Sequence, residues 1–366
     1  MADRTRKENP GPRQQKATAT VVLSMKPSST LPSLFRRFFL GLIPGLALIP
    51  TVHAQDQEKP APPEHSFLWK IEKADQATSY LFGTMHTPDP RVNSLHPTVV
   101  EVLNAADAFY TELPMDDMSD MQEAVMEVGI LPPEQNLKEL IGEEAWADLT
   151  ACVAKYNYPV GMFQRMRPFL AEITLGQLEL MPELTSGKKA LDERLYLVSK
   201  KKGKEVGGVE LLQEQIDALA HSRTEEETIE ALKRTMKNEL EREEGEPSSL
   251  ALLTKAYLTG SEARVMAILE EDFDPTNEGD MKFYRALIPV RNVRMADRTA
   301  KMMEEHPEKN YVFAFGTLHF MGEEGVPELL RAKGYTVTRM LAPADNLELP
   351  EESREEAGQE ELIEVH

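Results

Sequence analysis

Cysteine is almost absent from this chain of 366 residues, which contains a single one, Cys152. An intramolecular disulfide is therefore excluded, and we expect Cys152 to be a small buried or half-buried side chain in a helix. With 41% hydrophobic residues, the chain has enough apolar material for a large core without disulfides. A single cysteine does not indicate the compartment, because secreted proteins can also fold without disulfides.

Positive charge is also scarce, since 41 Lys and Arg face 62 Asp and Glu, for a formal net charge of −21. Binding to phosphate backbones requires clustered Lys and Arg, so nucleic acid is excluded as the expected partner. Two hydrolase signatures are missing as well, because neither H-E-x-x-H nor G-x-S-x-G occurs in the chain. Their absence leaves the familiar helical zinc motif and the serine nucleophile elbow without support.

Long hydrophobic runs are limited to FFLGLIPGLALIP, which two prolines interrupt and which is short for a transmembrane helix. Two arginines precede this run, and the small-residue sequence TVHAQ follows it. This order predicts a signal peptide over residues 1–54, with Met25 as an alternative start. We therefore expect an exported protein, periplasmic or secreted, with no stable membrane span after cleavage. A retained N-terminal anchor is the alternative.

The remaining chain divides by composition into three parts. Residues 55–65 form a Pro-rich linker, residues 66–341 a folded domain, and residues 342–366 an acidic tail that is predicted to be disordered. Within the domain, β-prone runs such as SFLWKIEK and TSYLFGT alternate with segments of helical periodicity. This predicts an α/β fold with a central, mostly parallel sheet flanked by helices. A large helical insertion, about residues 115–201, is expected between the N-terminal and C-terminal strands.

Four of the β-prone runs end in a residue that can bind a metal or transfer a proton. They are YLFGTMH at His86, AFYTE at Glu112, VGGVE at Glu210 and FAFGTLH at His319. Ligands bind beyond the carboxyl ends of the strands in parallel sheets, so we expect these four side chains to meet at one edge. A single strand-end histidine is more often structural, but two in near-identical F-G-T-x-H sequences favour a functional role.

The residues before each histidine indicate how the motif could work. Gly83 and Gly316 would allow a sharp bend or a close approach of the backbone at the strand end. The hydroxyls of Thr84 and Thr317 could bond the turn backbone and fix the direction of the histidine. We expect these four residues to support the motif rather than to react.

Imidazole and carboxylate groups at one edge would suit a divalent metal ion. Both are suitable ligands for Zn²⁺, Mn²⁺ or Co²⁺. A catalytic ion would keep one position open for water and lower the pKa of that water. A glutamate that does not bind the ion could then serve as the general base.

The sequence around these residues resembles the TraB/GumN family, which includes the animal TIKI proteins. Paired G-T-x-H motifs flank a helical middle, and the similarity extends from about Phe67 to Met340. LPPEQNLKELIGEEAW resembles part of the helical middle, and FGTLHFMGEEGVPELLRAKGYTV closely resembles the closing motif. One departure is LHP, at Leu95–Pro97, where a leucine-proline pair is expected. The positions that match recurrent family residues are Asp192, Glu210, Gln215, Arg291, Asn292 and Met295.

This resemblance implies an α/β fold similar to that of erythromycin esterase and the haem-binding ChaN proteins. TIKI proteins are divalent-metal-dependent proteases, so it also implies a metallohydrolase, of peptidase type, acting on a peptide or small-molecule substrate. His86 and His319 would ligate the metal with Glu112 as the third ligand, and Glu210 would be a ligand or the general base. Arg291 would hold a substrate carboxylate or stabilise an oxyanion, unless it lies on a solvated helix face.

Two other hypotheses use the same residues. A binding protein could sequester a peptide, haem or a metal through the two histidines without any turnover. An esterase could instead activate water through a His–Glu pair without a metal. The first hypothesis predicts stoichiometric binding and an inert Glu210→Gln variant, whereas the second predicts activity that survives EDTA.

Overall fold

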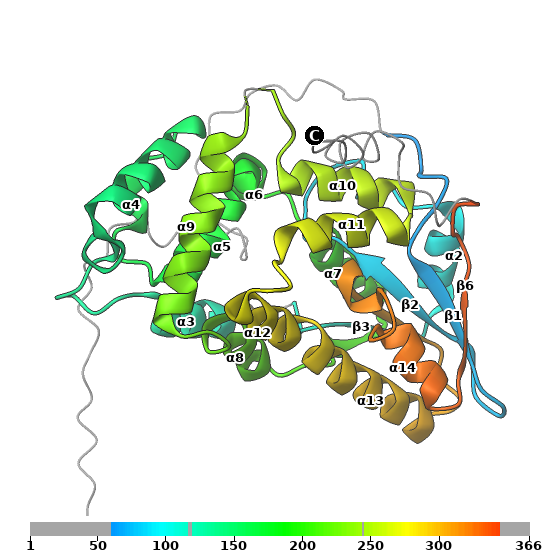
Figure 1. Ribbon diagram of the computed structural model, residues 1–366. Helices are drawn as coiled ribbons and strands as arrows, with labels where there is room; N and C mark the ends of the chain where they lie inside the picture. The colour runs from blue at the N-terminus through cyan, green and yellow to red at the C-terminus, as the bar shows by residue number, and fades with distance from the viewer. Residues whose placement is uncertain (1–59, 116–118, 244, 345–366) are drawn as a thin grey trace, which may run out of the picture.

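The computed structural model describes residues 60–115, 119–243 and 245–344, which contain a six-stranded sheet (Figure 1). The strands are β1 (Leu68–Glu72), β2 (Ser79–Thr84), β3 (Ala108–Thr111), β4 (Glu205–Gly208), β5 (Tyr311–Gly316) and β6 (Thr336–Arg339). Their order across the sheet is β4-β3-β5-β2-β1-β6. Strands β2 to β5 are parallel, whereas β1 pairs antiparallel with β2 and β6. The prediction of an α/β fold with a mostly parallel sheet is confirmed.

Helices flank the sheet and also form a separate group beside it (Figure 1). The α-helices are α2 (Pro97–Ala105), α3 (Ser119–Gly129), α4 (Leu137–Lys155), α5 (Pro168–Gly176), α6 (Met181–Thr185), α7 (Leu191–Lys201), α8 (Leu212–Ala220), α9 (Glu225–Glu241), α10 (Ser249–Thr259), α11 (Glu262–Asp272), α12 (Glu278–Leu287), α13 (Pro289–Glu305) and α14 (Val326–Ala332). The described residues also contain three 3₁₀ helices, η2 (Val160–Phe163), η3 (Leu178–Leu180) and η4 (Thr317–Phe320). Helices α3 to α7 connect β3 to β4, and α8 to α13 connect β4 to β5. Each helix in the described part of the chain is too short or too polar to cross a membrane.

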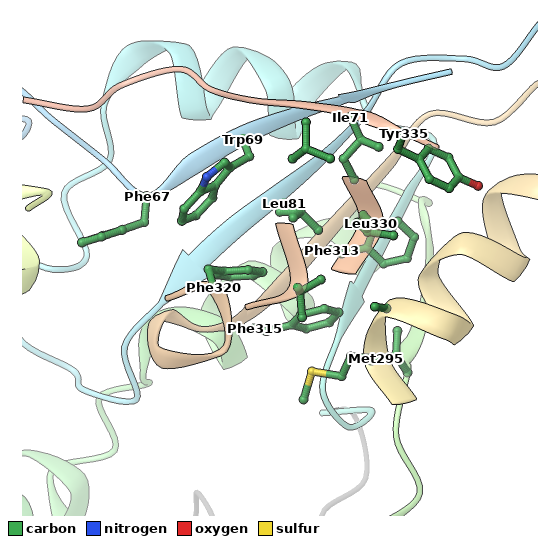
Figure 2. Close-up of a cluster of buried hydrophobic side chains, with 14 of the residues drawn as sticks. Phe67, Trp69, Ile71, Leu81, Met295, Phe313, Phe315, Phe320, Leu330 and Tyr335 are labelled. Carbon is green, nitrogen blue, oxygen red and sulfur yellow. The ribbon is translucent and has the colours of Figure 1, made fainter. Parts of the chain in front are cut away.

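Alternation of side chains along the strands explains why helices cover both faces of the sheet. On β5, Tyr311, Phe313 and Phe315 belong to a cluster that packs against α13 and α14 (Figure 2). Val312 and Ala314 belong to a second cluster, which packs against α2 and α7. Strand β5 is therefore buried on both faces.

A third core lies within the group of helices beside the sheet. It forms where α5 and α9 pack together with α4. Cys152 is fully buried there in α4, so the expectation of a small buried helical side chain is confirmed. The same core contains the buried methionines Met162, Met166, Met181 and Met236. Flexible thioether side chains suit the irregular gaps between short helices.

Two of the sequence predictions concern residues that lie wholly or mostly outside the described part of the chain. The predicted signal peptide, residues 1–54, lies outside them, and so does most of the predicted acidic tail. At the predicted start of the domain, the N–H of Ser66 donates to the carbonyl of Leu341, just beyond β6. The start and the end of the predicted domain therefore lie side by side.

Candidate functional site

The four candidate side chains that end the β-prone runs lie at one edge of the sheet. Strands β2, β3, β4 and β5 are parallel neighbours, so their carboxyl ends meet there. His86 lies two residues beyond the end of β2, and Glu112 directly follows β3. Glu210 lies two residues beyond β4, and His319 lies in η4, which directly follows β5.

The imidazoles of His86 and His319 face the same carboxylate oxygen, Oε1 of Glu112. The Nε2 atom of His319 lies 3.7 Å from Oε1 of Glu112, and the Nε2 atom of His86 lies 4.0 Å from the same oxygen. A single ion with bonds of about 2 Å requires ligand atoms within roughly 4 Å of one another, and each ring nitrogen meets this limit with respect to Oε1. Strand order explains this meeting, because β5 lies between β2 and β3.

Gly316 lies against all three of these side chains. A Cβ atom at Gly316 would lie 3.2 Å from Oε1 of Glu112, 3.6 Å from Nε2 of His86 and 3.8 Å from Cδ2 of His319. The backbone of Gly316 has φ −51°, so no sharp bend requires a glycine at this position. The close approach of three polar side chains is the reason for this glycine.

The other ring nitrogen of each histidine faces a buried acceptor. Nδ1 of His86 lies 2.8 Å from Oδ2 of Asp192, and Nδ1 of His319 lies 2.6 Å from Oδ1 of Asn292. The amide nitrogen of Asn292 donates to the carbonyl of Glu324, which fixes Oδ1 toward the ring. An amide oxygen only accepts, so His319 carries a proton on Nδ1 and presents the lone pair of Nε2 to the site. Metal-bound histidines are oriented by such partners.

Sequence reasoning matched Asp192 and Asn292 to family positions but gave them no role. Asp192 lies 106 residues from His86 along the chain, and Asn292 lies 27 residues from His319. Their contacts depend on how α7 and α13 pack against the sheet. Only the resemblance to the family could have identified Asp192 and Asn292 as site residues, because no local sequence motif links them to the histidines.

The two histidines have opposite electrostatic environments. The Asp192 carboxylate raises the pKa of His86 to about 9, whereas burial lowers the pKa of His319 to about 3. Burial alone would raise the pKa of Glu112, but Arg291 and the two imidazoles hold it well below its usual range. Glu112 is therefore a carboxylate and His319 a neutral imidazole, which are the forms that bind metal ions.

The structure directs Arg291 toward the protein's own glutamates. Its Nη2 atom donates to Oε2 of Glu112 over 2.7 Å and to Oε2 of Glu210 over 2.6 Å. Its Nε atom donates to Oε1 of Glu210 over 3.0 Å. The sequence analysis expected this guanidinium to hold a substrate carboxylate or an oxyanion. Its side chain is only 7% exposed, and its Nε and Nη2 donors point to the two glutamates.

Glu210 lies behind Glu112 rather than beside the histidines. Its side chain has no exposed surface and accepts hydrogen bonds from Arg291 and from Gln215. Burial raises the pKa of Glu210, an effect that Arg291 opposes. Among the described residues, no ion pair within 4.0 Å joins Glu210 to either histidine, in contrast to Glu112. The contacts therefore favour Glu112 over Glu210 as the third ligand.

The donor set fits a divalent ion only after a small contraction. In residues 60–115, 119–243 and 245–344, no three His, Cys, Asp or Glu side chains already stand in a metal-holding arrangement. Tetrahedral bonds of about 2.0–2.1 Å place ligand atoms roughly 3.3 Å apart, so the separations of 3.7 and 4.0 Å must each shorten by about half an ångström. A glycine at position 316 spares Oε1 of Glu112 a Cβ atom that would lie only 3.2 Å away.

The comparison with known proteins points to one family. The model of the TraB/PrgY/gumN family matches residues 67–339. The chain is 27% identical to metalloprotease TIKI1 of Danio rerio over 316 residues, which are 75% of this chain and 63% of that protein. It is also 27% identical to metalloprotease TIKI1 of Homo sapiens over 329 residues, 76% of this chain and 62% of that protein.

These relatives are longer than the matched region, because the chain spans less than two thirds of either one. A metalloprotease TIKI homolog of Nematostella vectensis is 25% identical over 328 residues, 77% of this chain and 68% of that protein. No solved structure matches the chain. The matched range contains the whole sheet, both G-T-x-H motifs and every site residue described above. The chain therefore belongs to the TraB/PrgY/gumN family.

Proposed function

We propose that this chain is an exported metal-dependent hydrolase of peptidase type, with His86, Glu112 and His319 as the metal ligands. One observation carries the proposal: two Nε2 atoms face one carboxylate oxygen beside Gly316. Two nitrogen donors and one oxygen donor suit Zn²⁺, Mn²⁺ or Co²⁺. Such an ion would polarise a scissile carbonyl and lower the pKa of a water molecule.

Two further findings support the reaction class and the compartment. The relatives that match this chain are named metalloproteases, and the match contains the candidate ligands. Peptide hydrolysis is the reaction that this name implies. Export is supported by the charged, apolar and small-residue order of residues 1–54, which lie outside the described part of the chain.

The residues around the ligands hold them in place. Asp192 and Asn292 orient the two rings through Nδ1, and the N–H of Gly316 donates to Oε1 of Glu112 over 2.7 Å. The side chain of His86 is 59% exposed, whereas that of His319 is 4% exposed. A substrate would therefore reach the site from the side of His86.

The test is cleavage of a peptide library by the purified protein after removal of metal and readdition of Mn²⁺, Co²⁺ or Zn²⁺. We expect cleavage that EDTA abolishes, that one of these ions restores, and that His319→Ala eliminates. Absence of metal-stimulated cleavage across a broad library, by folded and metal-loaded protein, would count against the proposal. Tight peptide binding without cleavage would instead support the sequestering role.

A metal-free hydrolase is a second candidate because His86 and Asp192 form a contact typical of general-base pairs. The raised pKa of His86, about 9, does not separate the two candidates, because the ring must lose its proton both to act as a base and to bind a metal ion. The two candidates differ in their response to chelation. Ester or peptide hydrolysis that survives EDTA and is lost in Asp192→Asn would establish the metal-free mechanism.

A further inference from the structure

We propose that Arg291 and Glu210 are positioning residues that restrict Glu112 to binding a metal through one oxygen, Oε1. The inference rests on the proposed function for the identity of the ligand, a divalent metal ion. It replaces the role of ligand or general base for Glu210 and the role of substrate anchor for Arg291. The two oxygens of Glu112 have separate hydrogen-bond partners, and this difference supports the proposal.

The two oxygens of Glu112 have different surroundings. Oε1 accepts the N–H of Gly316 over 2.7 Å and faces the Nε2 atoms of both histidines. Oε2 accepts from Nη2 of Arg291 over 2.7 Å and from the side-chain amide of Gln215 over 3.2 Å. A carboxylate whose second oxygen already accepts two hydrogen bonds is held as a one-oxygen donor.

Arg291 is itself held in a fixed orientation. Its Nε atom lies 3.0 and 3.2 Å from the two oxygens of Glu210, and Nη1 donates to the carbonyl of Leu287 over 3.2 Å. Since a guanidinium is a rigid planar fork, these contacts also fix the N–H that reaches Glu112. The backbone N–H of Glu210 donates to the carbonyl of Glu112 over 2.8 Å, so a hydrogen bond joins the backbones of the two glutamates.

Charge explains why a second glutamate is needed. A guanidinium beside a metal ligand repels a cation, and this repulsion is strong where water is excluded. The side chains of Arg291, Glu210 and Glu112 are only 7%, 0% and 9% exposed. Glu210 offsets the charge of Arg291, and Glu112 thereby keeps its attraction for a cation.

Fold stability alone is a weak explanation for this arrangement. Buried ion pairs contribute little net stability, because desolvation offsets much of the attraction between the charges. The Arg298–Glu214 pair offers a comparison, since Arg298 lies on the same helix as Arg291 and binds Glu214 of α8 over 2.6 and 2.8 Å. That pair is partly exposed, and the remaining hydrogen bond of Arg298 goes to the carbonyl of Val209 rather than to Glu112, so it provides a matched control.

The test is Co²⁺ titration of the purified protein followed by visible spectroscopy, in wild type, Arg291→Lys, Arg291→Met, Glu210→Gln and Arg298→Met. In the Arg291 variants Oε2 loses the guanidinium and keeps only the longer bond from Gln215, so we expect it to bind Co²⁺ as well, with a higher coordination number and weaker d–d absorption. In Glu210→Gln we expect Co²⁺ affinity to fall about 10- to 100-fold, the range for residues that orient metal ligands. Arg298→Met should change neither the spectrum nor the affinity.

Crystal structures of the same variants without metal provide a second readout. We expect the Glu112 carboxylate to rotate away from the N–H of Gly316 when Arg291 is replaced. Folded Arg291 and Glu210 variants with wild-type spectrum, affinity and Glu112 orientation would overturn the inference. Arg291→Lys keeps the charge without the fork, so it decides the question if Arg291→Met does not fold. A wild type that binds no Co²⁺ would contradict the proposed function, while the metal-free structures would still decide the role of Arg291.

Discussion

The two G-T-x-H motifs have almost the same sequence but unlike surroundings. His86 is largely exposed and faces a carboxylate, Asp192, whereas His319 is buried and faces an amide, Asn292. The Asp192 carboxylate raises the pKa of the first imidazole, and burial lowers the pKa of the second. What the motifs share is the direction of Nε2, which faces Oε1 of Glu112 in both cases. The repeated sequence therefore accounts for the common direction of the two Nε2 atoms, whereas the surroundings of the two rings differ.

The glycines and threonines of the two motifs also differ in their roles. A Cβ atom at Gly83 would lie 2.7 Å from Cβ of Phe67 and 2.9 Å from Oγ1 of Thr317, so this glycine serves close packing. Gly316 instead leaves space among polar atoms. The hydroxyl of Thr317 donates to the carbonyl of Thr84 over 2.8 Å, which joins the two motifs directly. Gly316 therefore borders the candidate metal ligands, whereas Gly83 and Thr317 serve the packing and hydrogen bonding that join the two motifs.

Substitution of Gly316 by alanine should produce the largest effect. The new methyl group would occupy the space between the candidate ligands, so we expect Gly316→Ala to fold and to lose all measurable metal binding. Metal per chain, measured by mass spectrometry after desalting, checks this. Gly176→Ala is a suitable control, because a Cβ at Gly176 would meet no atom within 4 Å. Normal metal binding by Gly316→Ala would place the ion elsewhere.

The partners of the two rings should have the next largest effect. We expect Asn292→Ala to weaken metal binding about 10- to 100-fold, because the ring of His319 loses the acceptor that fixes it. Asp192→Asn keeps an acceptor oxygen near His86 and should weaken binding less. Calorimetric titration with Zn²⁺ measures both variants. Equal affinities for Asn292→Ala and wild type would show that packing alone orients the ring of His319.

Gly83→Ala should affect stability rather than binding. The added methyl group overlaps the side chain of Phe67, and such overpacking costs about 1–3 kcal/mol in the free energy of unfolding. Urea denaturation of wild type and variant measures this cost. The folded variant should still bind metal, and loss of binding at unchanged stability would remove the distinction between the two glycines.

The threonines should show the smallest effect. Thr317→Val removes a buried hydrogen bond to the first motif and should cost about 0.5–1.5 kcal/mol of stability. The hydroxyl of Thr84 is buried without a partner in the described part of the chain, so Thr84→Val should be neutral or slightly stabilising. Denaturation midpoints compare the same substitution at matched positions. A larger cost at Thr84 would reverse this assignment.

Much of the frame follows from local sequence. All six strands coincide with short β-prone runs, and the position of His86, Glu112 and His319 after parallel strands follows from the rule that such ends share an edge. The order that places β5 between β2 and β3 does not follow from local pattern. That order is what brings the two histidines to one glutamate.

The inward direction of Arg291 could not be read from the sequence. Its partners Glu210 and Glu112 lie 81 and 179 residues away along the chain, so the contact exists only once α13 has packed on the sheet. The same holds for the acceptors at Asp192 and Asn292. A strand end limits where a side chain can lie, whereas a helical residue can face solvent, core or site.

The central claim is that both motifs and Glu112 serve one ion, and anomalous diffraction from crystals loaded with Zn²⁺ tests it most directly. We predict one strong peak at the edge of the sheet, bonded to Nε2 of His86, Nε2 of His319 and Oε1 of Glu112 at about 2.0–2.2 Å. A peak that lacks either histidine, or well-ordered crystals in Zn²⁺ with no peak at these three atoms, would contradict the account.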